Sequence, residues 1–136
     1  MKTKVLDFGA SGLSYVQVTV PVKATPHGEV VAVSLARIEE AVARALIEKG
    51  IPLRGAEVEF LRKALGLSLS ALGAELGVSG PAVLKWERAR DTRLHPMNEV
   101  ALRALVAEHL GLALSGHFSV LLGREKAPAS LRLRVA

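Results

Sequence analysis

Strict alternation of apolar and polar residues marks one stretch near the N-terminus, from Ser14 to Ala24. Four valines occupy every second position from 16 to 22, so they would share one face of a half-buried strand. Pro21 has no N–H to donate to a ladder, and we therefore expect this strand to lie at a sheet edge or to break there. Residues 25–28 predict a turn, and the β-branched run 29–33 could return as the second arm of a hairpin.

Residues 1–13 have little periodicity and contain two glycines, which predicts a loop-like lead-in. At the other end of the chain, residues 117–122 and 129–135 have strand spacing and are separated by a turn-rich segment. These two runs predict a C-terminal hairpin. Because an isolated two-stranded hairpin is only marginally stable, it could pair with the N-terminal strand.

Helical spacing dominates the middle of the chain. Residues 35–49 carry an apolar stripe between a candidate N-cap, Ser34, and a stop, Gly50. A second helix is predicted from about residue 56 to 65. Another is predicted from Met97 to Leu110, and its expected inner side comprises Val100, Ala101, Ala104, Leu105 and Leu110.

Two short helices joined by a tight turn are predicted between Leu67 and Arg90. Ser68 can cap the first of them, and Gly77 can end it because glycine tolerates the left-handed conformation. Ser79 can cap the second, in which Pro81 falls in the first turn, where its missing N–H costs nothing. Val83 and Trp86 would share the inner face of that second helix. A helix, a three-residue turn and a second helix form the helix-turn-helix pattern, whose second helix enters the DNA major groove.

These elements predict an α+β fold, in which four to five helices accompany a small antiparallel sheet built from N- and C-terminal strands. We expect three regions: residues 1–54 with strands and a helix, for dimerisation or partner binding; residues 55–112 as the helix-turn-helix domain; and residues 113–136 as the hairpin. The 136 residues suffice for one ordinary domain or two small subdomains.

Composition narrows the function classes. The chain has 18 Lys and Arg against 13 Asp and Glu, a net charge of +5, which attracts polyanions such as DNA but also fits a solvated basic surface. Cysteine is absent, which excludes disulfides and thiolate zinc sites. With no signal-like leader and no apolar run of about 20 residues, we expect a cytoplasmic protein without a membrane contact. The four histidines are scattered, so we predict neither a metal site nor an enzyme, and no cofactor.

The run from Phe60 to Ala89 resembles the XRE helix-turn-helix family, the class of phage lambda repressor and Cro. The shared features are Leu-Arg in the first helix, Leu-Ser before the second, Leu-Gly-Val-Ser at the turn and Val-x-x-Trp-Glu-Arg in the third. The longer span from Leu46 to Leu110 looks like the DNA-binding half of MqsA-like antitoxins. Those antitoxins often carry a cysteine-ligated zinc domain in front, which this sequence lacks.

The resemblance implies that the turn and outward face of the third helix read DNA. The residues at those positions are Ser79, Gly80, Pro81, Ala82 and Lys85. Only Lys85 offers a long polar side chain, for guanine O6 or N7, whereas the Ser79 hydroxyl can equally serve as a helix cap. Trp86 is expected in the core. The resemblance also implies that Arg62 and Glu87 pair with each other and hold two helices in register.

Three arginines follow the predicted recognition helix or end it: Arg88, Arg90 and Arg93. Members of the family reach phosphates from these positions, although cations at a helix C-terminus are also favoured by the helix dipole. The expected function is a sequence-specific regulator, a repressor that binds double-stranded DNA as a homodimer. The alternative is an antitoxin or protein-interaction module that binds a toxin or another protein, with DNA binding secondary.

Overall fold

Strand β2, Leu13–Thr25, forms the centre of the sheet in the computed structural model, which describes residues 2–114, 116–117 and 121–136. Its valines at positions 16, 18, 20 and 22 are all buried, which confirms the face predicted from the alternation. Strand β1, Thr3–Phe8, pairs antiparallel with β2. The predicted loop-like lead-in is therefore wrong, because residues 3–8 form an edge strand and residues 9–11 a 3-10 turn, η1 (Gly9–Ser11).

The other side of β2 is shared by two strands. Strand β3, Gly28–Val31, completes the predicted hairpin and pairs antiparallel with residues 22–25 of β2. Strand β4, Leu131–Arg134, pairs with residues 16–19 of β2, and this pairing is parallel. The N- and C-terminal parts of the chain thus build one sheet, as predicted. The sheet is mixed, however, and not purely antiparallel.

Pro21 lies within an unbroken central strand, so the prediction of an edge or a break is wrong. The N–H of Val22 donates to Lys2 O on the β1 side, and Pro21 O accepts from the N–H of Ala32 on the opposite side. Because backbone groups of successive residues point to opposite sides of a strand, the Pro21 nitrogen faces the side of β3 and β4. Pairing with β4 ends at Thr19 and pairing with β3 begins at Val22. The proline occupies the junction, where no donor is needed.

The predicted C-terminal hairpin does not form in the part of the chain that the structure describes. Residues 118–120 of its first arm lie outside the described residues. The N–H of Leu121, which follows these residues, donates to His117 O at 3.1 Å. The second arm does form a strand, but its partner is β2. Strand spacing identified β4 correctly, and its partner is the N-terminal strand with which these residues were expected to pair.

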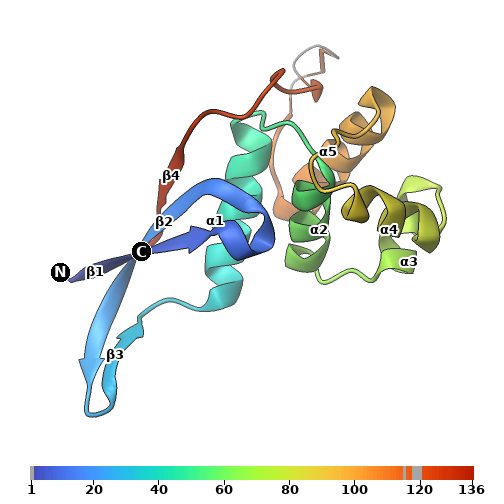
Figure 1. Ribbon diagram of the computed structural model, residues 1–136. Helices are drawn as coiled ribbons and strands as arrows, with labels where there is room; N and C mark the ends of the chain where they lie inside the picture. The colour runs from blue at the N-terminus through green and yellow to red at the C-terminus, as the bar shows by residue number, and fades with distance from the viewer. Residues whose placement is uncertain (1, 115, 118–120) are drawn as a thin grey trace.

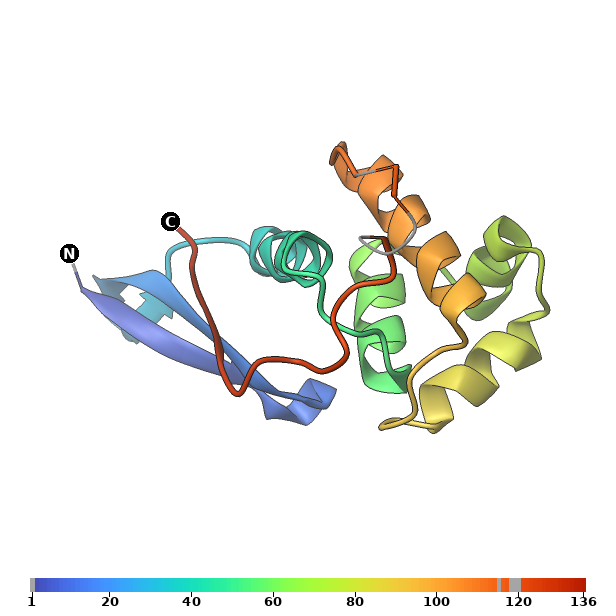
Figure 2. The same cartoon turned by 90° about the horizontal axis from the view of Figure 1, so that it is seen from above.

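Five helices have described bounds: α1 (Leu35–Glu48), α2 (Gly55–Ala64), α3 (Leu69–Leu76), α4 (Gly80–Arg88) and α5 (Pro96–Leu110). Each lies within one or two residues of its prediction, and the α+β class is confirmed. The three serines predicted as N-caps accept a hydrogen bond from the amide three residues later: Ser34, Ser68 and Ser79. Helix α1 covers one face of the sheet, and α2 to α5 gather on the far side of α1 (Figure 1, Figure 2).

The inner face of α5 differs from the prediction. Ala101 and Ala104, placed inside by the apolar spacing, are exposed. The buried residues are Glu99, Leu102, Arg103, Val106 and Ala107. The prediction assumed that every charged residue of the helix is exposed, and it therefore chose the wrong face. In the structure Glu99 and Arg103 are buried together, with Arg103 Nε 3.5 Å from Glu99 Oε2. The pair of opposite charges makes burial of both tolerable.

Candidate nucleic-acid interface

Helices α3 and α4 are joined by residues 77–79 and approach each other very closely. Gly77 ends α3 in the left-handed conformation with φ of 73°. A Cβ built on Gly73 would lie 2.5 Å from Val78 O, and one on Gly80 would lie 3.0 Å from Ser70 Oγ. The chain therefore requires glycine at 73 and has little room at 80. Gly80, one of the predicted reading residues, is half-buried where the start of α4 lies against α3.

An ion pair holds α4 against α2. Arg62 Nε and Nη2 donate to the two carboxylate oxygens of Glu87 at 2.6 and 2.9 Å, and the Glu87 side chain is only 3% exposed. This is the pair that the sequence resemblance implied. The hydrogen bonds to Glu87 raise the pKa of Arg62, so the cation is permanent. Val83 is fully buried beside them, and the half-buried Trp86 packs on the same core.

The opposite side of α4 faces solvent. Ser79, Pro81, Lys85 and Arg88 are exposed there, and Ala82 is half-buried. Within the described residues, the side chains of Lys85 and Arg88 form no hydrogen bond and no ion pair. Lys85 and Arg88 are three residues apart, so they lie on neighbouring parts of one helical surface. The Ser79 hydroxyl caps α4 by accepting from the Ala82 amide at 3.2 Å.

Arg90, predicted as a phosphate contact, binds within the fold. Its Nη1 donates to Glu59 at 2.7 Å and its Nη2 to Ser11 O at 2.9 Å. Gly12 has a φ of +79°, and a Cβ there would lie 2.6 Å from Arg90 Nη2. The guanidinium thus ties η1 to the end of α4. Burial raises the pKa of Glu59, but the hydrogen bond from Arg90 and the nearby cations outweigh burial and lower that pKa overall.

The guanidinium of Arg93, the last predicted phosphate contact, also forms its hydrogen bonds within the protein. Its Nε and Nη2 each donate at 2.8 Å to the two oxygens of Glu99, which is fully buried. Nη2 also donates to Leu122 O at 2.8 Å, so Arg93 fastens the segment that leads to β4. Glu99 in turn accepts from the Leu53 amide at 3.0 Å. Arg93 therefore supports the scaffold, and of the three arginines only Arg88 is free among the described residues.

A third buried acid, Glu57, escaped the sequence reasoning. Arg54 donates to it from Nε at 2.8 Å and from Nη2 at 2.6 Å, and the Tyr15 hydroxyl donates at 3.0 Å. Burial first, and then the Glu57 charge and hydrogen bond, raise the pKa of Tyr15. The available signal was the spacing, because a glutamate at the third helical position commonly binds the backbone N–H before the helix, as Glu57 does with Arg54 at 2.9 Å.

Other kinds of site find no support in the residues that the structure describes. No group of three His, Asp or Glu side chains there could hold a metal ion. Over the same residues, no helix combines the length and the apolarity that crossing a bilayer demands. Comparison of the chain with models of protein families, with curated proteins and with solved structures gives no match.

Proposed function

We propose that this protein is a sequence-specific DNA-binding regulator that acts as a homodimer and represses by occupying a promoter. The observation that carries the proposal is the outward surface of α4, where Lys85 and Arg88 stand free while the buried side of the helix is fixed by the Arg62–Glu87 pair. A rigid helix with unpaired cations on its solvent side suits the DNA major groove.

The chemistry of this surface assigns different tasks to its members. Lys85 is the group for guanine O6 or N7, and Pro81 and Ala82 can contact a thymine methyl. Arg88, near the C-terminal end of α4, is the group for a phosphate. Arg90 and Arg93 act indirectly in this proposal, because their guanidiniums already bind Glu59 and Glu99. In a dimer, the two α4 helices would enter successive major grooves about 34 to 36 Å apart.

Fluorescence anisotropy tests the proposal directly. The full chain is titrated against a labelled duplex from the region upstream of its own coding sequence and against a random duplex of equal length. We expect binding at 10⁻⁸ M or tighter to the upstream duplex at physiological salt, weakening steeply as salt rises. Equal affinity for both duplexes would contradict the proposed sequence specificity. Absence of binding even at low salt would contradict the proposed DNA-binding function.

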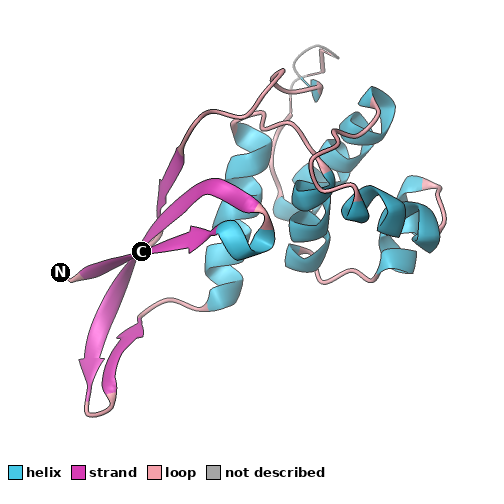
Figure 3. Ribbon diagram, viewed as in Figure 1, coloured by secondary structure: helices cyan, strands magenta, loops and turns pink. Residues whose placement is uncertain are grey.

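A protein partner is the second candidate, and the β2–β3 hairpin favours it. The hairpin extends beyond the helices (Figure 3), and β1 leaves one edge of the sheet unpaired in the described residues. Val5 on β1 is 59% exposed and Val30 on β3 is 42% exposed. Apolar side chains on open strand edges suit strand addition by a partner, such as a toxin bound by an antitoxin. Stoichiometric copurification from the native host would support this function, and its absence would oppose it.

A further inference from the structure

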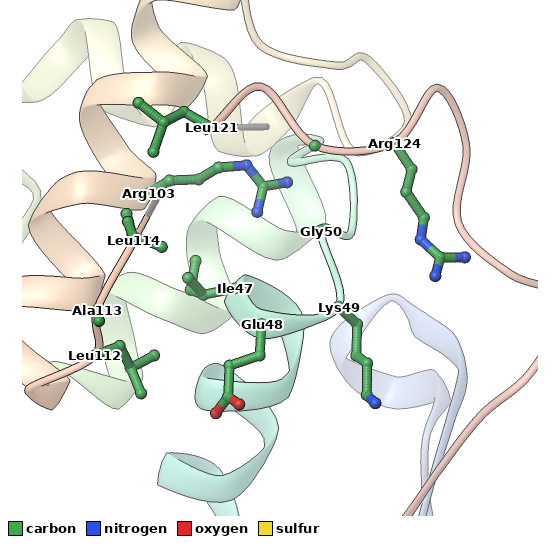
Figure 4. Close-up of a pocket in the computed structure, with 11 residues that line it drawn as sticks. Ile47, Glu48, Lys49, Gly50, Arg103, Leu112, Ala113, Leu114, Leu121 and Arg124 are labelled. Carbon is green, nitrogen blue, oxygen red and sulfur yellow. The ribbon is translucent and has the colours of Figure 1, made fainter. Parts of the chain in front are cut away.

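A cavity of about 500 Å³ lies between the end of α1, Arg103 of α5 and the segments that follow α5, and none of its lining residues belongs to α4. Its apolar lining comes from Ile47, Leu112, Leu114 and Leu121. The Arg103 side chain extends among these residues toward Gly50 (Figure 4). Glu48, Lys49 and Arg124 also line the cavity, and all three are exposed to solvent. Aliphatic side chains therefore share the lining with charged residues, of which only Arg103 is buried.

The guanidinium of Arg103 is buried but poorly satisfied. The side chain is 2% exposed, and its Nη2 donates to Ile51 O. Among the described residues, Nη1 has no hydrogen-bond partner, and the buried Nε forms no hydrogen bond although it lies 3.5 Å from Glu99 Oε2. Buried polar groups are nearly always hydrogen-bonded, and a guanidinium has five N–H donors. Most of these donors lack a partner in the protein.

The buried carboxylate of Glu99 faces two arginines, the buried Arg103 and the 31% exposed Arg93. Glu99 is shared by two arginines, since Arg93 takes both its oxygens in hydrogen bonds and Arg103 Nε lies 3.5 Å from Oε2. Two cations therefore face one carboxylate. Burial lowers the pKa of Arg103, and the charge of Arg93 acts in the same direction, while Glu99 opposes both. An added anion would compensate this excess positive charge.

The surrounding backbone keeps the guanidinium in place. A Cβ on Gly123, which has a φ of +82°, would lie 2.5 Å from Arg103 Nη2. The Arg124 amide donates to Gly50 O at 2.8 Å and so closes the segment over the end of α1. Packing thus holds the Arg103 side chain in one position, and its unpaired N–H groups are fixed with it.

We propose that this cavity binds a small aliphatic carboxylate. The carboxylate accepts hydrogen bonds from the free donors of Arg103, in the geometry that makes arginine–carboxylate contacts strong. The hydrocarbon chain lies against Ile47, Leu112 and Leu121, which offer no polar side-chain atom. A cavity of this size with one convergent polar group is typical of small-molecule sites. The proposal is independent of DNA binding, because the site shares no residue with the exposed face of α4.

Hexanoate serves as the probe, and hexan-1-ol is the matched control that has the chain without the charge. Both are titrated into the ¹⁵N-labelled full chain and followed by ¹H–¹⁵N correlation spectra. We expect saturable shifts centred on the amides of Gly50, Leu114 and Gly123 with hexanoate, and binding at least tenfold weaker with hexan-1-ol. The titration extends to millimolar hexanoate, about 20 times the protein concentration, which reaches about the weakest range of specific binding. If the shifts at these amides do not saturate over this range, the proposal is overturned. Equal binding of the two probes would also overturn it, since water alone would then satisfy Arg103.

Two variants locate the site. Arg103→Gln keeps hydrogen-bonding capacity but loses the charge, and we expect it to weaken hexanoate at least tenfold. Leu114→Glu places a carboxylate, which has the same charge as hexanoate, at the rim of the cavity and should weaken hexanoate binding. Because Leu114 is 36% exposed, this variant tests the site even if the Arg103 variant fails to fold. Lys23→Ala on the distant hairpin is the control. Wild-type affinity in a folded Arg103→Gln or Leu114→Glu protein would refute the assignment, whatever the outcome of the DNA titration.

Discussion

Glu87 on α4 and Arg62 on α2 share two hydrogen bonds of 2.6 and 2.9 Å across the interface between their helices. The carboxylate is buried, and the arginine side chain is 13% exposed. Arg62 Nη1 also donates to Leu67 O at 3.1 Å, which fixes the segment between α2 and α3. One guanidinium thus joins α2, the segment that follows it, and α4.

Removing Arg62 should strongly destabilise the protein. In Arg62→Ala the Glu87 carboxylate remains buried without a cation, which costs about 3 to 5 kcal/mol in the free energy of unfolding. Urea denaturation measures this loss. Lys63→Ala, on the same helix at a side chain 61% exposed, should change stability by less than about 0.5 kcal/mol. The double variant Arg62→Met, Glu87→Leu should recover much of the loss, and a double variant as unstable as Arg62→Ala would contradict the electrostatic explanation.

The close approach of α3 and α4 predicts a cost for a single added methyl group. In Gly73→Ala the new Cβ would lie 2.5 Å from Val78 O and 3.0 Å from Ser79 C. Alanine gains about 1 kcal/mol over glycine in helix propensity, but overpacking against backbone typically costs about 1 to 3 kcal/mol. We therefore expect a lower melting temperature. Gly116→Ala, where nothing lies within 4 Å of the added Cβ, is the control and should melt like the wild type.

The single tyrosine of the chain makes the Tyr15–Glu57 contact directly observable. Folding raises the pKa of Tyr15, so its contribution to stability is complete below the unfolded pKa of about 10 and is lost as pH rises above it. Absorbance of the phenolate should therefore remain absent at pH 10 to 11 in the folded protein and increase only on unfolding.

The matching variant isolates this effect from the titration of lysines. In Tyr15→Phe the free energy of unfolding should decrease less steeply above pH 10 than in the wild type, because no phenol is left to ionise. Chemical denaturation at pH 7, 10 and 11 provides the comparison. A phenolate signal at about pH 10 in fully folded wild-type protein would show that Tyr15 is not held in its protonated form.

Caps and apolar spacing predicted the helices well because both are local. Ser34, Ser68 and Ser79 precede their helices and bind amides three residues on, so tertiary contacts were not needed to place them. Strand β1 was missed because it is an edge strand with a mostly exposed pattern, in which Lys4 and Asp7 interrupt any alternation. The pairing of the C-terminal strand with the N-terminal strand was expected, but its parallel direction was missed, because the paired residues lie more than 100 positions apart and no tight turn fixes the direction.

The candidate interface was only partly predictable from the sequence, because contacts between distant residues decide which of its cations are unpaired. Arg88, Arg90 and Arg93 are equivalent in sequence terms, being cations at or beyond the end of one helix. Their roles differ because acids from distant positions reach two of them, Glu59 for Arg90 and Glu99 for Arg93. A sequence reading that assigns charges to the surface cannot separate these cases. The same assumption misplaced the inner face of α5, where Arg103 is buried.

The proposed DNA contact predicts different results for Lys85 and Arg88. Lys85→Ala should weaken the upstream duplex by about 1 kcal/mol, roughly fivefold, and leave the random duplex almost unchanged, because a base contact is lost. Arg88→Ala should weaken both duplexes alike and reduce the slope of log affinity against log salt by about 1, because a phosphate contact is lost. Anisotropy titrations at several salt concentrations measure both quantities. Lys23→Ala, which removes the same charge on the hairpin, controls for the general electrostatic attraction, and an equal effect of all three variants would leave α4 without a specific role.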